Sequence, residues 1–321
     1  MDETAWLSER FEEHRGHLRA VAYRMLGSLA DADDAVQDAW LRVARSDAAQ
    51  TENLSGWLTT IVARVCLNML RARNVRREQP VDFHVPDPVV ALPAGGLQPD
   101  DQAVLADSVG LALLVVLDTL APAERLAFVL HDLFGMPFQE IAPMVERTPA
   151  AARQLASRAR RRVRGVAPDA PETNLTLQRA LVDAFFAAAR DADFDALVAL
   201  LDPDVVLRID GGAALPAASM LLRGAEAVTR QAGRGLRSLF VRPGMRVHPA
   251  LVNGAAGVVV TDGGRPMTVI GFTIAGGKIV EIDAVADPQR LPIAALREAL
   301  PTAGADPRPA LFIPPGDAGL P

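Results

Sequence analysis

Residues 148–164 read TPAAARQLASRARRRVR, and this stretch indicates the class of fold. Thr148 is well placed as an N-cap and Pro149 as the first helical residue, so the sequence predicts a helix from here to Arg164. Small and apolar side chains recur on one side of that helix, at positions 152, 155, 159 and 163. The spacing predicts an amphipathic helix with one buried face.

The opposite side of this helix is cationic. Residues 147–164 contain seven arginines and no acidic residue. A solvated face normally mixes charge signs, so this one is typical of a recognition helix that reads base edges in the major groove and holds phosphates. The alternative is an exposed arginine-rich helix without a partner. The candidate contact residues are Arg147, Thr148, Ala150, Arg153, Gln154, Ser157, Arg158, Arg160 and Arg161.

The residues before this helix predict a helix-turn-helix. Segments 112–120 and 122–132 have helical periodicity, and Phe138-Gln139-Glu140-Ile141-Ala142 follows them. Two residues depart from the usual pattern. Glu146 stands where such turns often have a glycine with positive φ, and Pro143 should kink or shorten its helix.

A second cationic surface is expected on a helix from about residue 56 to residue 73. No acidic residue interrupts the sequence from Arg64 to Arg77. Arginines interspersed with hydroxyl and amide side chains are typical of a surface that follows phosphates and reads bases. Trp57 either belongs to the core or lies at the base of a loop that holds an unstacked base. The candidates are Asn53, Trp57, Thr60, Arg64, Asn68, Arg71, Arg73, Arg76 and Arg77.

An acidic row is expected on a helix over residues 31–45. Asp31, Asp34 and Asp38 lie beside the apolar stripe of this helix. Helix capping and solvation explain acids in the first turn. A docking face for a partner protein is the other interpretation, and the residues alone favour solvation.

Taken together, these segments resemble the extracytoplasmic-function (ECF) sigma factors of bacterial RNA polymerase. Residues 31–42 (DADDAVQDAWLR) look like region 2.2, and residues 57–68 look like the promoter-melting part of region 2. Residues 118–125 (DTLAPAER), 138–142 and 153–160 look like region 4. The resemblance implies two all-α DNA-binding domains, with region 2 reading the −10 element of promoter DNA and region 4 the −35 element. It also implies that core polymerase docks through its clamp helices on Asp31, Asp34, Gln37, Asp38 and Leu41.

From about residue 174 the pattern changes to two helical segments, 177–190 and 194–201, and then to glycine-punctuated strands. Residues 279–285 alternate apolar and acidic side chains, which predicts a half-buried strand. This part resembles a SnoaL-like domain of the α+β NTF2-like fold, a curved sheet wrapped around helices. In sigma factors of this group the domain adjusts activity in cis. The family motifs match only partly here, at Asp210, Gly211, Gly212, Asp287, Pro288 and Arg290.

The expected organisation has five parts. Region 2 spans 1–80, region 4 spans 107–166 and the SnoaL-like domain spans 174–300. Residues 81–106 are acidic and rich in proline, so we expect an extended linker that buries no apolar area. The end, 301–321, is rich in Pro, Gly and Ala and is expected to be a disordered tail.

Composition excludes several classes of protein. The net charge of −6 argues against a polybasic protein, although 32 of the 33 basic residues are arginines, the exception being Lys278. The single cysteine, Cys66, excludes a disulfide framework, and no cofactor or metal site is expected. The longest apolar run, 111–117, is far shorter than the ~20 residues that span a bilayer. A cytoplasmic protein without membrane contact is therefore expected.

Two alternative functions remain open from the sequence. One is a helix-turn-helix regulator that binds operator DNA without polymerase and carries a ligand-binding NTF2-like domain. The other is an NTF2-like isomerase or cyclase with Asp210 or Asp283 as base and His248 as its partner. A small-ligand pocket without turnover is favoured over catalysis.

Overall fold

The computed structural model describes residues 3–45, 53–76, 83–92, 110–166, 171–293 and 296. Its first unit is a helical bundle made of α1 (Glu3–Leu26), α2 (Leu29–Val43) and α3 (Leu54–Arg76). Ser28 caps α2, because its side chain accepts a hydrogen bond from the Asp31 amide. The expected apolar stripes of α2 and α3 are largely buried, and Cys66 is buried with them. Both helices therefore pack as their periodicity predicts.

The second unit contains the predicted helix-turn-helix. Its elements are α5 (Leu111–Asp118), α6 (Pro122–Phe128), a π-helical turn (Val129–Leu133), α7 (Phe138–Ile141) and α8 (Pro149–Val166). The Thr148 hydroxyl accepts a hydrogen bond of 3.2 Å from the Ala151 amide, so the expected cap of α8 is present. Helix α7 ends before Pro143, and Glu146 adopts the left-handed backbone conformation with a φ of 55°. The turn is therefore made without the usual glycine, at the cost of local strain.

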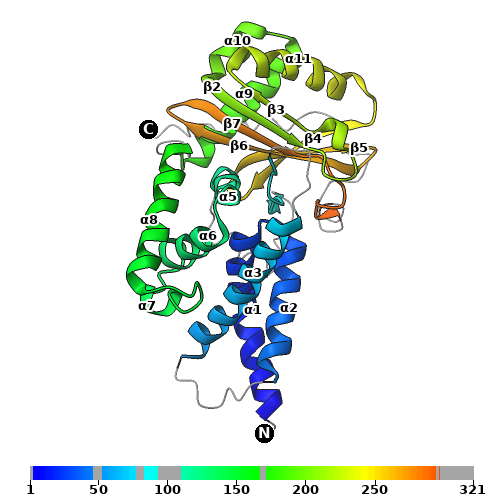
Figure 1. Ribbon diagram of the computed structural model, residues 1–321. Coiled ribbons are helices and arrows are strands. Elements are labelled where there is room, and N and C mark those ends of the chain that lie inside the picture. Colours follow the sequence, from blue (N-terminus) through cyan, green and yellow to red (C-terminus); the bar gives the residue numbers. More distant parts are fainter. Residues whose placement is uncertain are drawn as a thin grey trace, which may run out of the picture.

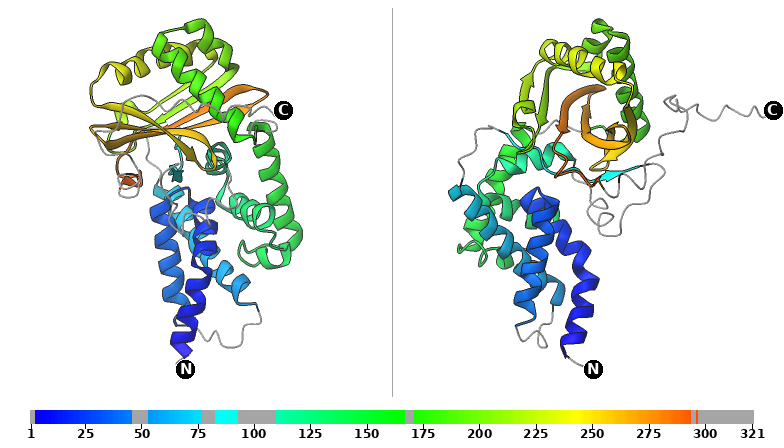
Figure 2. Two further views of the ribbon diagram at one scale, coloured as in Figure 1. Left: turned by 180° about the vertical axis from the view of Figure 1, so that it is seen from behind. Right: turned by 90° about the vertical axis from the view of Figure 1, so that its right-hand side faces the viewer.

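The third unit is a mixed sheet covered by helices. Its helical elements are α9 (Leu175–Asp191), α10 (Phe194–Leu200), a short 3-10 turn (Pro216–Ala218) and α11 (Ala225–Val241). Its strands are β2 (Leu201–Asp210), β3 (Met220–Arg223), β4 (Met245–Val252), β5 (Ala255–Asp262), β6 (Arg265–Ala275) and β7 (Lys278–Val285). With β1 (Val90–Ala91), which comes from the proline-rich segment, the order of the described strands is β1-β4-β5-β6-β7-β2-β3, in which only the β7–β2 pair is parallel. Figure 2 shows how strongly this sheet curves.

The sheet has apolar residues on both faces. On one face Phe185 of α9 packs with Phe272 and Ile282 of the sheet, under the helices α9 to α11 (Figure 1). On the other face Val269 and Val285 join the core of the two helical units. The sheet is therefore a layer between its own helices and the rest of the chain.

Helix α5 is the main contact between the second unit and this sheet. Its residues are apolar on almost every side because it lies among α1, α8 and the strands β6 and β7. Leu111 lies over Gly271, where an added Cβ would be only 3.3 Å from the leucine Cδ2. The apolar run 111–117 is thus explained by burial between domains.

The expectation for the linker is wrong for residues 83–92. Val85, Val89 and Leu92 are buried in the core shared with the helical bundle. Residues Val90–Ala91 form β1, which pairs with β4 at the edge of the sheet. A proline-rich segment can contribute apolar side chains when neighbouring domains provide the surfaces that cover them. Residues 93–106 and the tail 301–321 lie outside the described residues.

The strand expected at 279–285 is confirmed as β7, but the expectation that it is half-buried is wrong. Glu281 and Asp283 are buried at 5% and 2% exposure. Arg208 on the neighbouring strand β2 pairs with both, at 3.2 Å and 2.9 Å. The alternation of apolar and acidic residues is real, but both faces of the strand are covered.

Candidate nucleic-acid interface and interdomain junction

Helix α8 exposes most of its cationic face. Ala152, Ala156 and Ala159 are buried against the rest of the helix-turn-helix. The candidate residues that are exposed are Arg147, Thr148, Ala150, Arg153, Gln154, Ser157, Arg158 and Arg161. This row is accessible to a polyanion in the conformation described.

Two arginines of α8 are engaged within the chain. Arg160 Nε lies 2.5 Å from Asp132 Oδ1, and Arg162 Nη1 lies 3.5 Å from Glu124 Oε2. The segment 147–164 contains no acid, but the fold brings acids from α6 and the π-helical turn. In this conformation Arg160 is an internal contact of the helix-turn-helix.

Helix α3 also presents a cationic row. Arg64, Asn68 and Arg71 are exposed, and Thr60 is half-buried with its hydroxyl bonded to the Gly56 carbonyl. Arg73 is different, because it pairs with Asp31 of α2. Asn53 caps α3, because its side chain accepts a hydrogen bond from the Gly56 amide, and Trp57 is half-buried against the core. The side chain of Arg76 and all of Arg77 lie outside the described residues.

The acidic row of α2 forms a single exposed strip. Asp34, Gln37, Asp38 and Leu41 follow one another at helical spacing and are all exposed, with Leu41 at 48%. Asp31 is half-buried by its pair with Arg73 and does not extend this strip.

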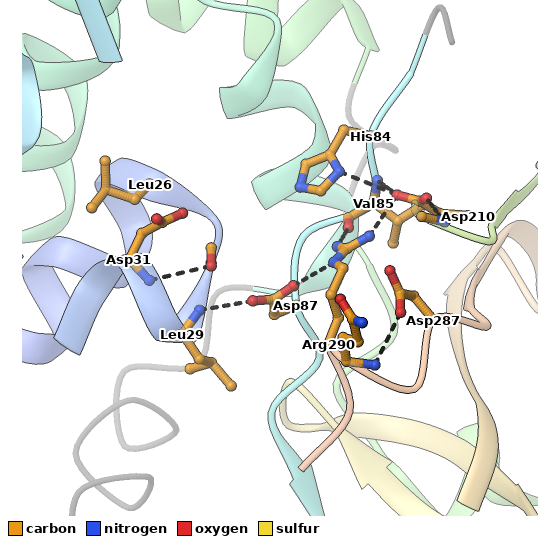
Figure 3. A network of polar contacts seen from close by, with 12 residues as sticks. Leu26, Leu29, Asp31, His84, Val85, Asp87, Asp210, Asp287 and Arg290 are labelled. Atoms are coloured by element: carbon orange, nitrogen blue, oxygen red, sulfur yellow. Dashed lines mark hydrogen bonds and ion pairs between the residues drawn. The ribbon is translucent and has the colours of Figure 1, made fainter. Parts of the chain in front are cut away.

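Arg290 connects the third unit to residues 83–92 (Figure 3). Its Nε donates to Asp87 Oδ1 at 2.7 Å and its Nη1 to Asp210 Oδ2 at 2.8 Å, while Nη2 donates to the Val85 carbonyl. Asp87 in turn accepts a bond of 2.9 Å from the Leu29 amide, at the first residue of α2. A carboxylate at this end of a helix is favoured by the helix dipole. One arginine therefore links the sheet domain to the start of the acidic helix.

The two partial motifs expected at 210–212 and 287–290 lie together. A Cβ on Gly212, which has a φ of 56°, would overlap the Asp287 carboxylate. Burial alone would raise the pKa of Asp210. Hydrogen bonds from His84 and the Val85 amide, with the charge of Arg290, outweigh burial and hold that pKa well below its usual range. Asp210 is a permanent anion that binds the segment 83–92.

A second contact joins the same three parts of the chain. The Tyr23 hydroxyl donates to the Asp87 carbonyl at 2.5 Å and accepts from Asn253 Nδ2 at 2.9 Å. Asn253 Oδ1 accepts from the Val89 amide at 3.1 Å. Burial raises the pKa of Tyr23, so its hydroxyl stays protonated as the donor. We call residues 83–92 with Tyr23, Asp210, Asn253 and Arg290 the junction.

Family models match each of the three units. The Sigma-70 region 2 model matches residues 10–76, the Sigma-70 region 4 model matches 110–163, and the SnoaL-like domain model matches 182–282. Two helical sigma domains are thus followed by an α+β SnoaL-like domain, which is the fold class expected from the sequence.

Relatives cover nearly the whole chain. ECF RNA polymerase sigma factor SigJ of Mycobacterium tuberculosis is 38% identical over 302 residues, which is 90% of this chain and 94% of the relative. The chain belongs to the ECF sigma factors. Probable ECF sigma factor SigI of the same organism is 32% identical, over 89% of this chain and 94% of the relative. The crystal structure of M. tuberculosis SigJ matches with a TM-score of 0.68 at 34% identity, covering 89% of this chain and 99% of that one.

In this sigma factor regions 2 and 4 contact each other directly. Arg125 of α6 is 1% exposed, and its Nε donates to the Arg24 carbonyl of α1 at 3.3 Å. Arg24 lies over the Phe134 ring at 5.0 Å. Burial lowers the pKa of Arg125, although Asp118 opposes this effect from 2.9 Å. The two DNA-binding regions are held in a closed arrangement.

The relatives decide between the functions that the sequence left open. They are sigma factors, so the helix-turn-helix regulator without polymerase is not favoured. In the described part of the chain no helix is long and apolar enough to cross a membrane.

The sequence analysis did not single out Asp87, His84 or Asn253. Asp87 lies between Pro86 and Pro88, and the backbone that these prolines restrict was the only sequence feature that could have drawn attention to it. Asn253 precedes Gly254 at a turn with a φ of 49°, which the Asn-Gly pair indicates. Neither signal reveals the distant partner.

Proposed function

We propose that this sigma factor reads the −10 element with the exposed row of α3 and the −35 element with that of α8. The observation that carries this proposal is the exposure of both cationic rows, Arg64 to Arg71 and Arg147 to Arg161, in one chain. Helices α3 and α8 both belong to the helical part of the molecule that lies below the sheet in Figure 1. The strip Asp34, Gln37, Asp38 and Leu41 of α2 docks on the clamp helices of core polymerase.

The SnoaL-like domain restrains this activity in cis. The −10 and −35 elements are separated by about 80 Å of B-form DNA at about 3.4 Å per base pair, whereas α3 and α6 are in direct contact here. Regions 2 and 4 must therefore separate before both elements are read. The junction ties the SnoaL-like domain to the start of α2 in region 2, and α5 of region 4 packs on strands β6 and β7 of the same domain. Because the domain holds both regions, the junction opposes their separation.

The protein acts in the cytoplasm, and the SnoaL-like domain binds a small ligand without converting it chemically. Asp283, one of the two carboxylates considered as a base, is paired with Arg208 on the sheet face away from α9 to α11. Asp210 is held by His84, Val85 and Arg290. Neither carboxylate is available as a general base in this arrangement.

Transcription in vitro with core RNA polymerase tests the function. The full chain and core polymerase are incubated with a duplex pool that is randomised upstream of a reporter cassette, and the transcribed templates are sequenced. We expect enrichment of two sequence blocks separated by a fixed spacing. Absence of any enriched block, with an active control sigma factor in parallel, would overturn the proposal.

A further inference from the structure

Arg153, on the exposed face of α8, lies against an aromatic pair. Its guanidinium carbon is 5.4 Å from the centre of the Phe138 ring. The His131 ring stacks on Phe138, with centroids 3.9 Å apart and an interplanar angle of 30°. A cation near the face of an aromatic ring is attracted by the quadrupole of the ring. The ring therefore limits the positions that this flexible side chain adopts.

Phe138 and His131 are themselves fixed. Phe138 opens α7 and is buried. His131 lies in the π-helical turn, and its Nδ1 is 2.9 Å from the Met136 carbonyl, which fixes a proton on this nitrogen. A π-helical turn inside a helix is uncommon and often occurs at a functional site. Here it directs His131 toward Phe138.

Arg153 differs from its neighbour Arg160 in what it contacts. Asp132 of the same π-helical turn neutralises Arg160. Arg153 has no acidic partner among the described residues, so its N–H groups remain available for an acceptor outside the chain. An arginine that points into the major groove most often makes two hydrogen bonds to O6 and N7 of guanine. Restricting its rotamers beforehand reduces the entropy lost on binding.

From this geometry we infer that Phe138, supported by His131, is a positioning residue that holds Arg153 for contact with a guanine in the upstream promoter element. The inference rests on the proposed function, because it needs region 4 to read DNA. Phe138 itself touches no base and acts through Arg153.

The experiment uses the full chain with core polymerase and a promoter selected from the randomised pool. Four variants are compared, Phe138→Leu, Arg153→Ala, their double combination and Ile141→Val. Ile141 is a buried residue of the same helix, so Ile141→Val controls for lost packing. For each variant we measure the ratio of affinities for the selected duplex and for one with the guanine replaced, together with the thermal unfolding temperature.

We expect Phe138→Leu to lower this discrimination about two- to fivefold, in line with an exposed cation–π contact. Arg153→Ala should lower it further, and Phe138→Leu should add nothing in the Arg153→Ala background. Ile141→Val should leave the ratio unchanged. Unchanged discrimination in Phe138→Leu or in Arg153→Ala, or additive effects in the double variant, would overturn the inference alone. Failure to select any promoter would instead overturn the proposed function.

Discussion

Arg290 Nε lies 2.7 Å from Asp87 Oδ1, and this ion pair joins the C-terminal domain to the segment between the two sigma regions. Asp87 also caps the helix that carries the exposed acidic strip. A change in the SnoaL-like domain therefore reaches the proposed polymerase-binding helix through two side chains.

Replacing Arg290 by alanine should open the closed arrangement. The change removes the cation shared by Asp87 and Asp210, and a buried carboxylate that loses its partner costs about 3–5 kcal/mol. We expect the radius of gyration of the free chain to increase in solution scattering, and promoter-directed transcription with core polymerase to rise.

Arg265→Ala is the matched control, because Arg265 is an exposed arginine at the start of β6. It should change neither measurement. An Arg290→Ala chain that stays compact and transcribes like the parent would contradict a restraining junction.

Deleting residues 174–321 removes the restraint together with the support that the sheet gives to region 4, and because we expect the loss of support to outweigh the release, transcription should fall. The deletion removes the sheet that covers α5 and leaves Leu111 and its apolar neighbours without their partner. Exposed apolar area destabilises region 4, so we expect lower transcription and stronger binding of an apolar dye. Transcription equal to that of the full chain would refute this dependence.

Reversing the charge of Asp38 should weaken assembly with core polymerase. Asp38 is exposed, so the fold should tolerate Asp38→Lys, while a like charge at a complementary interface is unfavourable. We expect at least a tenfold loss of affinity at low salt, about 1.4 kcal/mol, and a smaller loss at high salt. Glu9→Lys, an exposed reversal on α1, is the control. Equal losses in both variants would mean that the α2 strip is not the docking surface.

The stability of the chain should depend on pH through Asp283. Burial, together with the charge of Glu281 and against that of Arg208, raises the pKa of Asp283 from 3.8 to about 6. Between these values the folded chain holds more protons than the unfolded chain. The contribution of this group to the unfolding free energy therefore falls as pH rises from about 4 to 6, by at most about 3 kcal/mol.

Asp283→Asn should remove this dependence, as measured by urea unfolding at a series of pH values across this range. The exposed Asp262→Asn should retain it. A parent chain whose stability profile matches that of Asp283→Asn would show that the folded chain does not hold the extra proton on this carboxyl between pH 4 and 6.

The helices and their exposed faces were predictable because helical periodicity is a local property. Positions three and four apart share a face, so Ala152 and Ala159 turn inward and Arg153 turns outward wherever the helix packs. Ala156, which is also buried, was not among the positions expected on that face. The cap at Thr148 depends on neighbouring residues only. The resemblance to sigma regions added the roles of these faces.

The partners of charged residues were not predictable, because they come from distant parts of the chain. Asp132 reaches Arg160, Asp31 reaches Arg73, and Arg208 reaches Asp283, each across many residues. Composition predicted an extended linker at 83–92, but apolar side chains such as Val85 are buried once three domains surround them.

The sequence by itself determined which segments are helical, which of their faces carry cations, and to which family the chain is similar. Only the tertiary structure decided that Arg290, Asp210 and Asp87 meet, and that Phe138 lies beneath Arg153. The physical reason is the distance along the chain over which each kind of interaction acts. Backbone propensity and periodicity act over a few residues, whereas an ion pair or a ring contact requires that packing of the whole chain first brings its two members together.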